Sequence, residues 1–124
     1  MSSTKTTDAV RAVIGSAAEA WAANDVEAFV GHYAEEATAI LPGFALLGRA
    51  AIRTAMGAAF AGPLKGTRRI HQVQGVRFLD DTTALVTTRS STEPPADQWS
   101  IATWVLSARS GRWLIEAYHD CPAA

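Results

Sequence analysis

The chain has 124 residues, of which 48% are hydrophobic and 19% charged, and its formal net charge is −1. These values fit one soluble globular domain and argue against disorder. The chain has no basic run and no apolar stretch of membrane-spanning length, so we expect neither a nucleic-acid nor a membrane partner. Cys121 is the only cysteine, which excludes an intrachain disulfide. Since the start also lacks the apolar run of a signal peptide, we expect a cytoplasmic protein.

The first half of the chain predicts helices. Residues 1–6 are polar and are expected to be disordered. From residue 7 to residue 23, apolar side chains recur at the three-to-four spacing of an amphipathic helix. Asn24 and Glu27 resemble a capping box, and a second helix is predicted behind them. The apolar spacing continues in that helix through Val26, Phe29, Val30 and Tyr33.

The next segment predicts a broken strand followed by a third helix. Residues 38–41 form a short apolar run that Pro42 and Gly43 stop or bend. A second apolar run covers 44–47. A helix is predicted over 49–61, and Gly62 with Pro63 ends it.

The second half predicts a meander of strands over 68–78, 82–91, 98–109 and 112–120, joined by turns and one proline-containing loop. Helices first and strands afterwards are typical of an α+β fold with helices on one face of a curved antiparallel sheet. We therefore expect one domain over 7–120 and a short tail over 121–124.

The strand over 98–109 is apolar on both faces. Trp99, Ile101 and Val105 alternate with Ala102, Trp104 and Leu106. An antiparallel strand with one solvated face would alternate apolar with polar residues. One face can pack on the helices, and the other needs a second cover. We expect that cover to be a second copy of the chain, giving a homodimer through the outer face of the sheet.

Three local motifs, in this order, carry a family resemblance. They are Trp21 before Asn24-Asp25, the segment Gly48-Arg49-Ala50-Ala51-Ile52, and Gly111-Arg112-Trp113-Leu114-Ile115 leading to His119. With the order of elements, they resemble the nuclear-transport-factor-2-like superfamily, and within it the SnoaL-like proteins of polyketide and enediyne biosynthesis clusters. The resemblance implies a cone-shaped α+β barrel with three N-terminal helices on the concave face of the sheet. It also implies an apolar, cyclic or polyene-like ligand in the cone.

The mechanism of ketosteroid isomerase, an enzyme of this fold, is not carried by this sequence. The residue that corresponds to the catalytic aspartate of the isomerase is Leu41, and its oxyanion tyrosine falls at about Ala17. Neither side chain can move a proton or donate a hydrogen bond. A carboxylate base on the first strand is therefore absent.

Two residues remain as catalytic candidates, His119 and Tyr33. Counting by two along the last strand places His119 on the face of Trp113, Ile115 and Ala117, and the resemblance directs that face toward the cavity. A neutral imidazole there could act as a general acid or base, although a histidine packed in the core or at the rim is the simpler alternative. Tyr33 could support a polar group in the cone or could pack with its hydroxyl at the surface.

The ligand-binding candidates are mostly large side chains that could equally be core. For Arg89 the alternative is a side chain facing water, and the face of strand 98–109 that lines the cavity stays open. The candidates are Trp21, Leu41, Phe44, His71, Arg89, Trp104, Trp113, Ile115 and Ala117.

The sequence supports no metal site and no cofactor. The three histidines are far apart, and no phosphate loop or nucleophile elbow is present. Three functions stay open. The first is an enzyme that cyclises, isomerises or dehydrates a polyketide-type intermediate, and the second is a non-catalytic binding or accessory dimer. The third is a stress- or toxin-related stand-alone domain with another small ligand.

Overall fold

A computed structural model describes residues 3–123 of the chain, with side chains from residue 7 onward. Residues 1–2 of the segment expected to be disordered lie outside the described part, and the first helix begins at Ser3 instead of residue 7. The elements, in chain order, are α1 (Ser3–Ala22), α2 (Val26–Val30), β1 (Tyr33–Leu41), β2 (Phe44–Leu47), α3 (Arg49–Ala61), β3 (Arg68–Asp80), β4 (Thr83–Glu93), β5 (Trp99–Arg109) and β6 (Arg112–Pro122).

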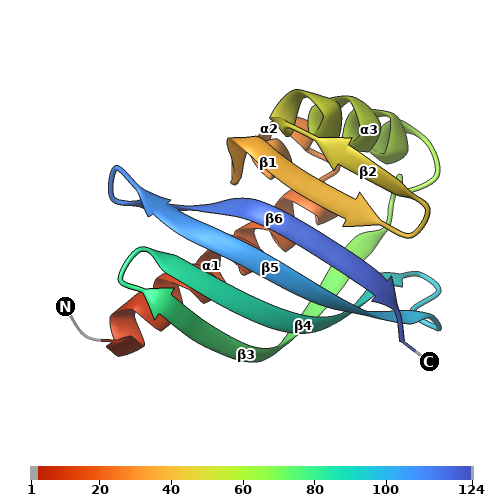
Figure 1. Ribbon diagram of the computed structural model, residues 1–124. Coiled ribbons are helices and arrows are strands. Elements are labelled where there is room, and N and C mark those ends of the chain that lie inside the picture. Colours follow the sequence, from red (N-terminus) through yellow and green to blue (C-terminus); the bar gives the residue numbers. More distant parts are fainter. Residues whose placement is uncertain (1–2, 124) are drawn as a thin grey trace.

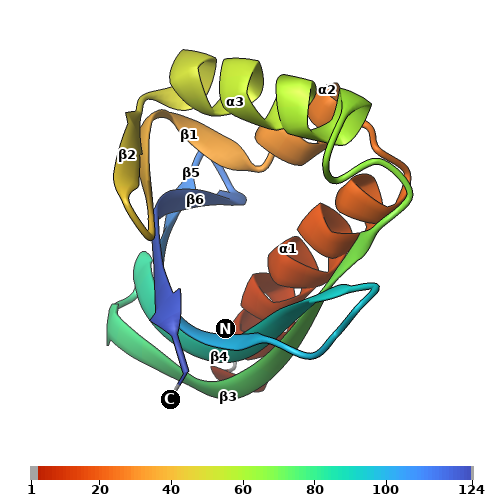
Figure 2. The same ribbon diagram turned by 90° about the vertical axis from the view of Figure 1, so that its right-hand side faces the viewer.

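The strands form one curved sheet in the order β2-β1-β6-β5-β4-β3 (Figure 1). Every neighbouring pair is antiparallel except β1 with β6, which run parallel. The sheet bends around α1, and α2 and α3 close the wide end (Figure 2). The predicted α+β cone with helices on the concave face is confirmed.

The core lies between α1 and the concave face of the sheet. Helix α1 presents Val10, Ile14 and Ala17, all buried, at the spacing that places them on one face. The central strands of the sheet contribute buried inward-facing residues to the same core, among them Trp104 and Leu106 of β5. The inner face of β5 is therefore the face of Ala102, Trp104 and Leu106.

Helix α2 begins and ends differently from the prediction. Its N-cap is Asp25, whose side chain accepts a hydrogen bond from the backbone N–H of Ala28 at 3.1 Å. Asn24 instead adopts a left-handed conformation with φ of 51°, and its side chain accepts from the backbone N–H of Gly66. The helix ends at Val30, and Tyr33 begins strand β1, so the predicted continuation of the helix to Tyr33 is wrong.

A β-bulge in β6 decides which side chains of this strand face the core. Val105 pairs with Ala117, whereas Leu106 pairs with Ile115, so Glu116 is an extra residue on β6. The bulge shifts the alternation by one residue. Ile115 and the later residues Tyr118 and Asp120 are buried, and His119 between the last two is exposed.

Candidate functional site

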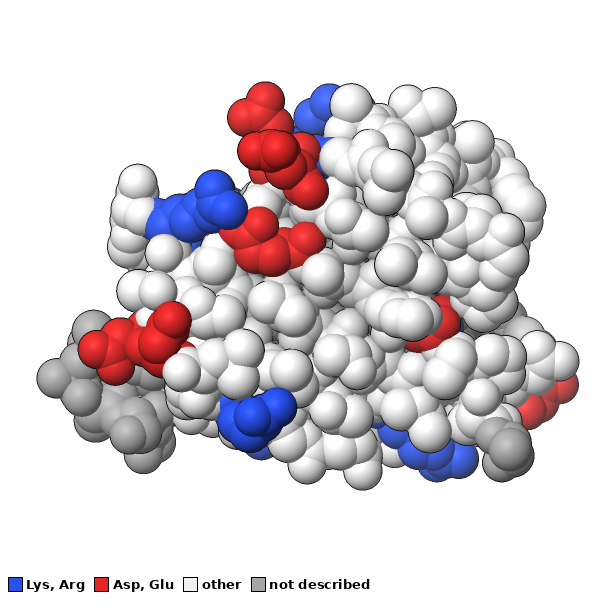
Figure 3. Space-filling view, in the orientation of Figure 1, with Lys and Arg blue, Asp and Glu red and all other residues white. Residues whose placement is uncertain are grey.

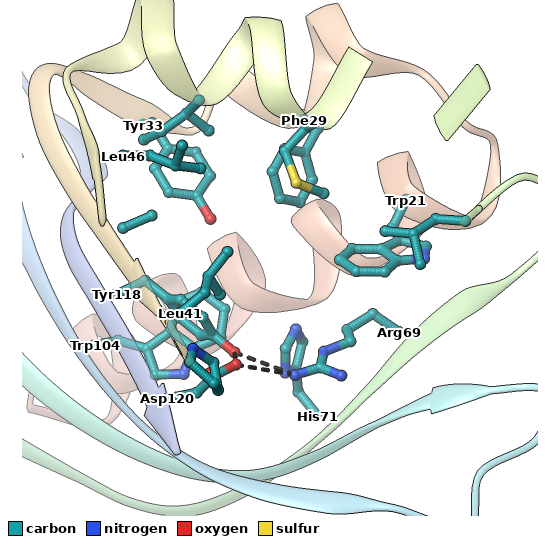
Figure 4. A pocket seen from close by; sticks show the side chains of 15 residues that line it. Trp21, Phe29, Tyr33, Leu41, Leu46, Arg69, His71, Trp104, Tyr118 and Asp120 are labelled. Carbon is teal, nitrogen blue, oxygen red and sulfur yellow. Dashed lines mark hydrogen bonds and ion pairs between the residues drawn. The ribbon is translucent and has the colours of Figure 1, made fainter. Parts of the chain in front are cut away.

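A cavity of about 220 Å³ lies between the helices and the concave face of the sheet (Figure 4). All three helices contribute to its lining, and β1, β2, β3, β5 and β6 supply most of the rest. Its lining residues are Trp21, Phe29, Tyr33, Ala39, Leu41, Pro42, Leu46, Ile52, Met56, Leu64, Arg69, His71, Trp104, Tyr118 and Asp120. This volume lies below the roughly 300–1,000 Å³ of typical ligand pockets, so the cavity suits a small ligand.

The helical side of the cavity is apolar and aromatic. The ring of Phe29 lies 6.1 Å from that of Trp21, 5.3 Å from that of Tyr33 and 5.6 Å from that of Phe60. These edge and tilted contacts hold rigid side chains in one arrangement. Trp21 is fixed further by its indole N–H, which donates to the hydroxyl of Thr67 at 2.9 Å. This side therefore offers shape and apolar surface, with few polar groups.

The sheet side of the cavity carries a buried ion pair. Arg69 of β3 and Asp120 of β6 approach to 3.3 Å between Nη2 and Oδ2, with side chains 13% and 6% exposed. The Tyr118 hydroxyl donates to the same Oδ2 at 2.7 Å. Arg69 also donates to the hydroxyls of Thr92 and Ser100, at 2.9 and 3.2 Å. Such a network holds both charges in place away from water.

One oxygen of Asp120 stays free of this network. Within residues 7–123, Oδ1 is the one buried side-chain nitrogen or oxygen atom without a hydrogen-bond partner. Oδ1 has almost no accessible surface, and the hydrogen bonds of this carboxylate run through Oδ2. Asp120, Arg69 and Pro42 also line a second, more open hollow of about 420 Å³, which meets the cavity at these three residues.

Burial shifts the pKa values of the two tyrosines of the cavity upward. Burial raises the pKa of Tyr118 above its usual range, with Arg69 opposing this shift and Asp120 adding to it. Burial also raises the pKa of Tyr33. Both phenols are therefore neutral hydrogen-bond donors at any ordinary pH.

The hydroxyl of Tyr33 points into the cavity (Figure 4). Tyr33 is 4% exposed, and no described residue hydrogen-bonds to its hydroxyl. The hydroxyl is also not among the buried unpaired atoms, so it retains access to the space inside the cavity. It is available to a ligand from the side opposite Asp120.

His71 lies next to Arg69 on β3, two residues along the strand and on the same face (Figure 4). Its Nδ1 is 2.7 Å from the hydroxyl of Ser90, and its ring packs edge-on against Trp104 at 4.9 Å. Burial, together with the positive charge of Arg69, lowers the pKa of His71 to about 3. The imidazole is therefore neutral at physiological pH.

The structure brings five of the predicted site residues together in the cavity. They are Trp21, Tyr33, Leu41, His71 and Trp104. The face of strand β5 that lines the cavity is therefore the face of Trp104. Of the two alternatives for Tyr33, the structure has the one in which the side chain lines the cavity, and the residue belongs to a strand and not to a helix.

The other predicted site residues lie elsewhere. His119 is exposed on the outer face of the sheet, so the predicted orientation of His119 toward the cavity is wrong, and the bulge at Glu116 is the reason. Ala117 lies on that same outer face, and Phe44 is 54% exposed at the sheet edge. Arg89 lies over the ring of Trp99 at 4.6 Å.

Two further candidates are inward-facing but do not reach the cavity. Ile115 is fully buried in the core. Trp113 packs against Phe78, with ring centroids 6.1 Å apart, beyond the cavity wall. Their prediction as pocket lining failed because facing the core and facing the cavity are different properties.

Three site residues were missed from the sequence: Arg69, Tyr118 and Asp120. Arg69 lies in the predicted strand over 68–78 but was not a site candidate, and it faces inward because it shares the face of His71. The alternation of β3, which places His71 inward, was the available signal for Arg69. No local signal indicates the bulge in β6, so Tyr118 and Asp120 were out of reach.

The part of the chain that the structure describes has no group of three or more metal-ligating side chains that could hold a metal ion. Among the same residues, no helix is both long and apolar enough to cross a bilayer. The one cysteine, Cys121, is exposed.

Comparison with known proteins identifies relatives of the whole domain. The SnoaL-like domain profile matches residues 14–114. A domain of unknown function with a cystatin-like fold from Nostoc punctiforme is 26% identical, with a TM-score of 0.85, over 99% of this chain and 80% of that one. A search of the curated proteins found no match.

Two more solved structures share the fold at lower identity. An uncharacterized protein with a cystatin-like fold from Caulobacter vibrioides is 20% identical with a TM-score of 0.82, over 95% of this chain and 89% of that one. An NTF-2 like protein of unknown function from Shewanella oneidensis is 19% identical with a TM-score of 0.80, over 93% and 98%.

Proposed function

The chain belongs to the SnoaL-like domain family, and we propose that it binds an uncharged, largely apolar polyketide-type intermediate and helps to cyclise, isomerise or dehydrate it. The observation that carries this proposal is the carboxylate of Asp120 in the lining of a cavity that is mostly apolar and aromatic. In this proposal, Asp120 has the acid–base role for which His119 was the candidate from the sequence. The apolar lining selects the ligand, and the carboxylate supplies acid–base chemistry.

The chemistry starts from a proton on the carbon next to a carbonyl group of the ligand. The carboxylate of Asp120 accepts this proton, and the electron pair left behind moves onto the carbonyl oxygen. The hydroxyl of Tyr33, which is unpaired, is available to donate to a developing oxyanion. The carboxylic acid then returns the proton to another position of the ligand, or to a leaving hydroxyl group that departs as water.

The test uses a model ligand, α-tetralone, whose protons next to the carbonyl exchange for deuterium when a base removes them. In deuterium oxide, the wild-type protein is expected to accelerate this exchange over buffer, as followed by NMR. Asp120→Asn should lower the acceleration at least about tenfold. Arg69 and Tyr118 both donate to the Oδ2 position, which holds the amide oxygen there and directs the amide NH₂ to the Oδ1 position.

His119→Asn is the matched control, since it alters a polar residue next in sequence that faces away from the cavity. It should leave the exchange rate unchanged. If the wild-type protein binds α-tetralone without accelerating exchange, the catalytic proposal fails. The protein is then a non-catalytic binder or accessory protein, a function favoured by the compensation of the Asp120 charge by Arg69.

We also propose that the protein works as a homodimer through the outer face of the sheet. The centre of that face carries few charged side chains (Figure 3), and Ile40 and Ile101 are 37% and 48% exposed there on β1 and β5. Exposed apolar residues on nearby strands favour association. Light scattering should give a dimer for the wild type and a monomer for Ile101→Lys. The control, Leu79→Lys, alters an equally exposed apolar residue at the far end of β3 and should stay dimeric.

A further inference from the structure

Four side chains of the sheet form a continuous chain of hydrogen bonds that ends at the cavity. The indole N–H of Trp104 donates to the hydroxyl of Thr88 at 3.0 Å. The Thr88 and Ser90 hydroxyls lie 2.9 Å apart, and the Ser90 hydroxyl lies 2.7 Å from Nδ1 of His71. Thr88 and Ser90 are fully buried on β4. We call Trp104, Thr88 and Ser90 the relay.

The chemistry of the relay sets the direction of its hydrogen bonds. An indole N–H can only donate, so Thr88 accepts from Trp104. Ser90 is the only other described side chain that the Thr88 hydroxyl contacts, so the Thr88 proton goes to Ser90. The Ser90 proton is then donated to Nδ1 of His71. The reverse direction would leave the buried Thr88 proton without an acceptor, which costs about 1–3 kcal/mol.

This direction decides which nitrogen of His71 carries the proton. Nδ1 accepts from Ser90, and in the neutral ring the proton must therefore be on Nε2. The edge-on contact with Trp104 holds the ring in this orientation. No described residue hydrogen-bonds to Nε2, and Nε2 is not among the buried unpaired atoms. His71 lines the cavity, so its Nε2–H is a neutral donor available to whatever binds there.

We propose that Trp104, Thr88 and Ser90 are positioning residues that hold His71 as an Nε2–H donor, and that the ligand of this cavity presents an uncharged acceptor, a carbonyl oxygen, to it. This inference rests on the proposed function for the existence of a cavity ligand. It narrows the ligand class: the molecule accepts a hydrogen bond at His71 and offers a proton at Asp120. An enolisable or hydroxylated cyclic ketone has both features.

The first test reads the proton position on His71 directly. With ¹⁵N-labelled histidine, long-range proton–nitrogen NMR distinguishes a protonated Nδ1 from a protonated Nε2. Wild-type His71 should show a protonated Nε2 alone at neutral pH. Ser90→Ala removes the donor to Nδ1, so a fraction with a protonated Nδ1 should appear.

The matched control is Ser91→Ala. It makes the same change at the next buried residue of β4, whose hydroxyl donates to the backbone carbonyl of Gln98 instead. It should keep the wild-type spectrum. A protonated Nδ1 or a doubly protonated ring in the wild type overturns the inference. So does a Ser90→Ala spectrum identical to that of the wild type, because the relay would then not determine the tautomer.

The second test measures the acceptor preference with two ligands of equal size, α-tetralone and tetralin, which differ by the carbonyl group. The wild type should bind α-tetralone about fivefold more tightly than tetralin, as expected for one neutral hydrogen bond. His71→Phe keeps a ring at this position and should lose most of this preference, with Tyr33 as the remaining free donor in the cavity. Equal binding of both ligands by the wild type overturns the ligand assignment.

The two proposals can fail separately. Loss of proton exchange in Asp120→Asn together with equal binding of α-tetralone and tetralin by the wild type removes only the assignment at His71. A retained preference for α-tetralone without accelerated exchange removes only the catalytic role of Asp120.

Discussion

The two sides of the cavity differ in how they are built. On the helical side, the rings of Trp21, Phe29 and their neighbours pack against one another through non-directional van der Waals contacts. On the sheet side, Arg69, Asp120 and Tyr118 hold one another by directional hydrogen bonds from two strands that are not neighbours in the sheet. Removing atoms from an apolar wall lowers stability in proportion to the volume removed. Removing the partner of a buried charge leaves that charge uncompensated, which lowers stability more.

The largest expected loss of stability comes from a substitution on the sheet side of the cavity. Arg69→Met keeps an unbranched side chain but leaves the carboxylate of Asp120 buried without its cation, at a cost of about 3–5 kcal/mol in unfolding free energy. Urea unfolding followed by tryptophan fluorescence measures it. Arg68→Met is the matched control, because Arg68 pairs with Glu93 at the surface, where such pairs contribute about 0–1 kcal/mol. Equal losses for the two variants would contradict the structural role of the buried pair.

A smaller effect is expected on the helical side. Ile52 of α3 is 1% exposed and lines the cavity. Ile52→Ala should cost about 2–3 kcal/mol, at the lower end of such substitutions, because one side of Ile52 already faces open space. The same unfolding experiment measures it. A loss larger than that of Arg69→Met would reverse the comparison between the two sides.

The neutral state of His71 makes stability depend on pH. Its folded-state pKa of about 3 lies below its ordinary value of 6.5, so the unfolded chain binds the proton more readily between these values. Stability from this group is therefore fully present above about pH 6.5 and is lost as the pH falls, by about 1.4 kcal/mol per pH unit. His71→Gln cannot titrate and should show a weaker loss, with a difference of about 2 kcal/mol by pH 5.

The unfolding free energies of the wild type and His71→Gln are compared at several pH values. The contributions of the carboxylates and of His32, whose pKa is also lowered by burial and by Arg112, are the same in both proteins and cancel in the difference. Parallel curves for the two proteins would mean that His71 is solvated in the folded state.

The smallest contrast is between the two tyrosines of the cavity. Tyr118→Phe removes a donor to Oδ2 of Asp120 and should cost about 1 kcal/mol, since Arg69 still donates to that oxygen. Tyr33→Phe removes a hydroxyl without a protein partner and should stay within about 0.5 kcal/mol of the wild type. Thermal or urea unfolding of both variants decides this. A larger loss for Tyr33→Phe would reveal a structural role for its hydroxyl.

Local patterns in the sequence were enough for most elements of the fold. Helix α3 over Arg49–Ala61 and strand β2 over Phe44–Leu47 have the predicted bounds, because apolar spacing and the Pro-Gly and Gly-Pro breaks define them locally. The prediction failed at Tyr33, where a spacing of three from Val30 suits a helix but the residue pairs with Ile115 in the sheet. Pairing with a strand some 80 residues away is not a local property.

The candidate site divides in the same way. Trp21, Leu41 and His71 were found because each follows the periodicity of its own element. Arg69 and Asp120 were not, because their burial depends on each other: a charged side chain faces inward only where an opposite charge from another strand meets it.

The sequence by itself determined the α+β order and the apolar character of the cone, since each follows from residue type and spacing along one segment. Tertiary structure decided which polar groups face the cavity. One extra residue at Glu116 turns His119 out of the sheet and Tyr118 and Asp120 into it, because side chains alternate at every residue of a strand and a single insertion reverses all that follow.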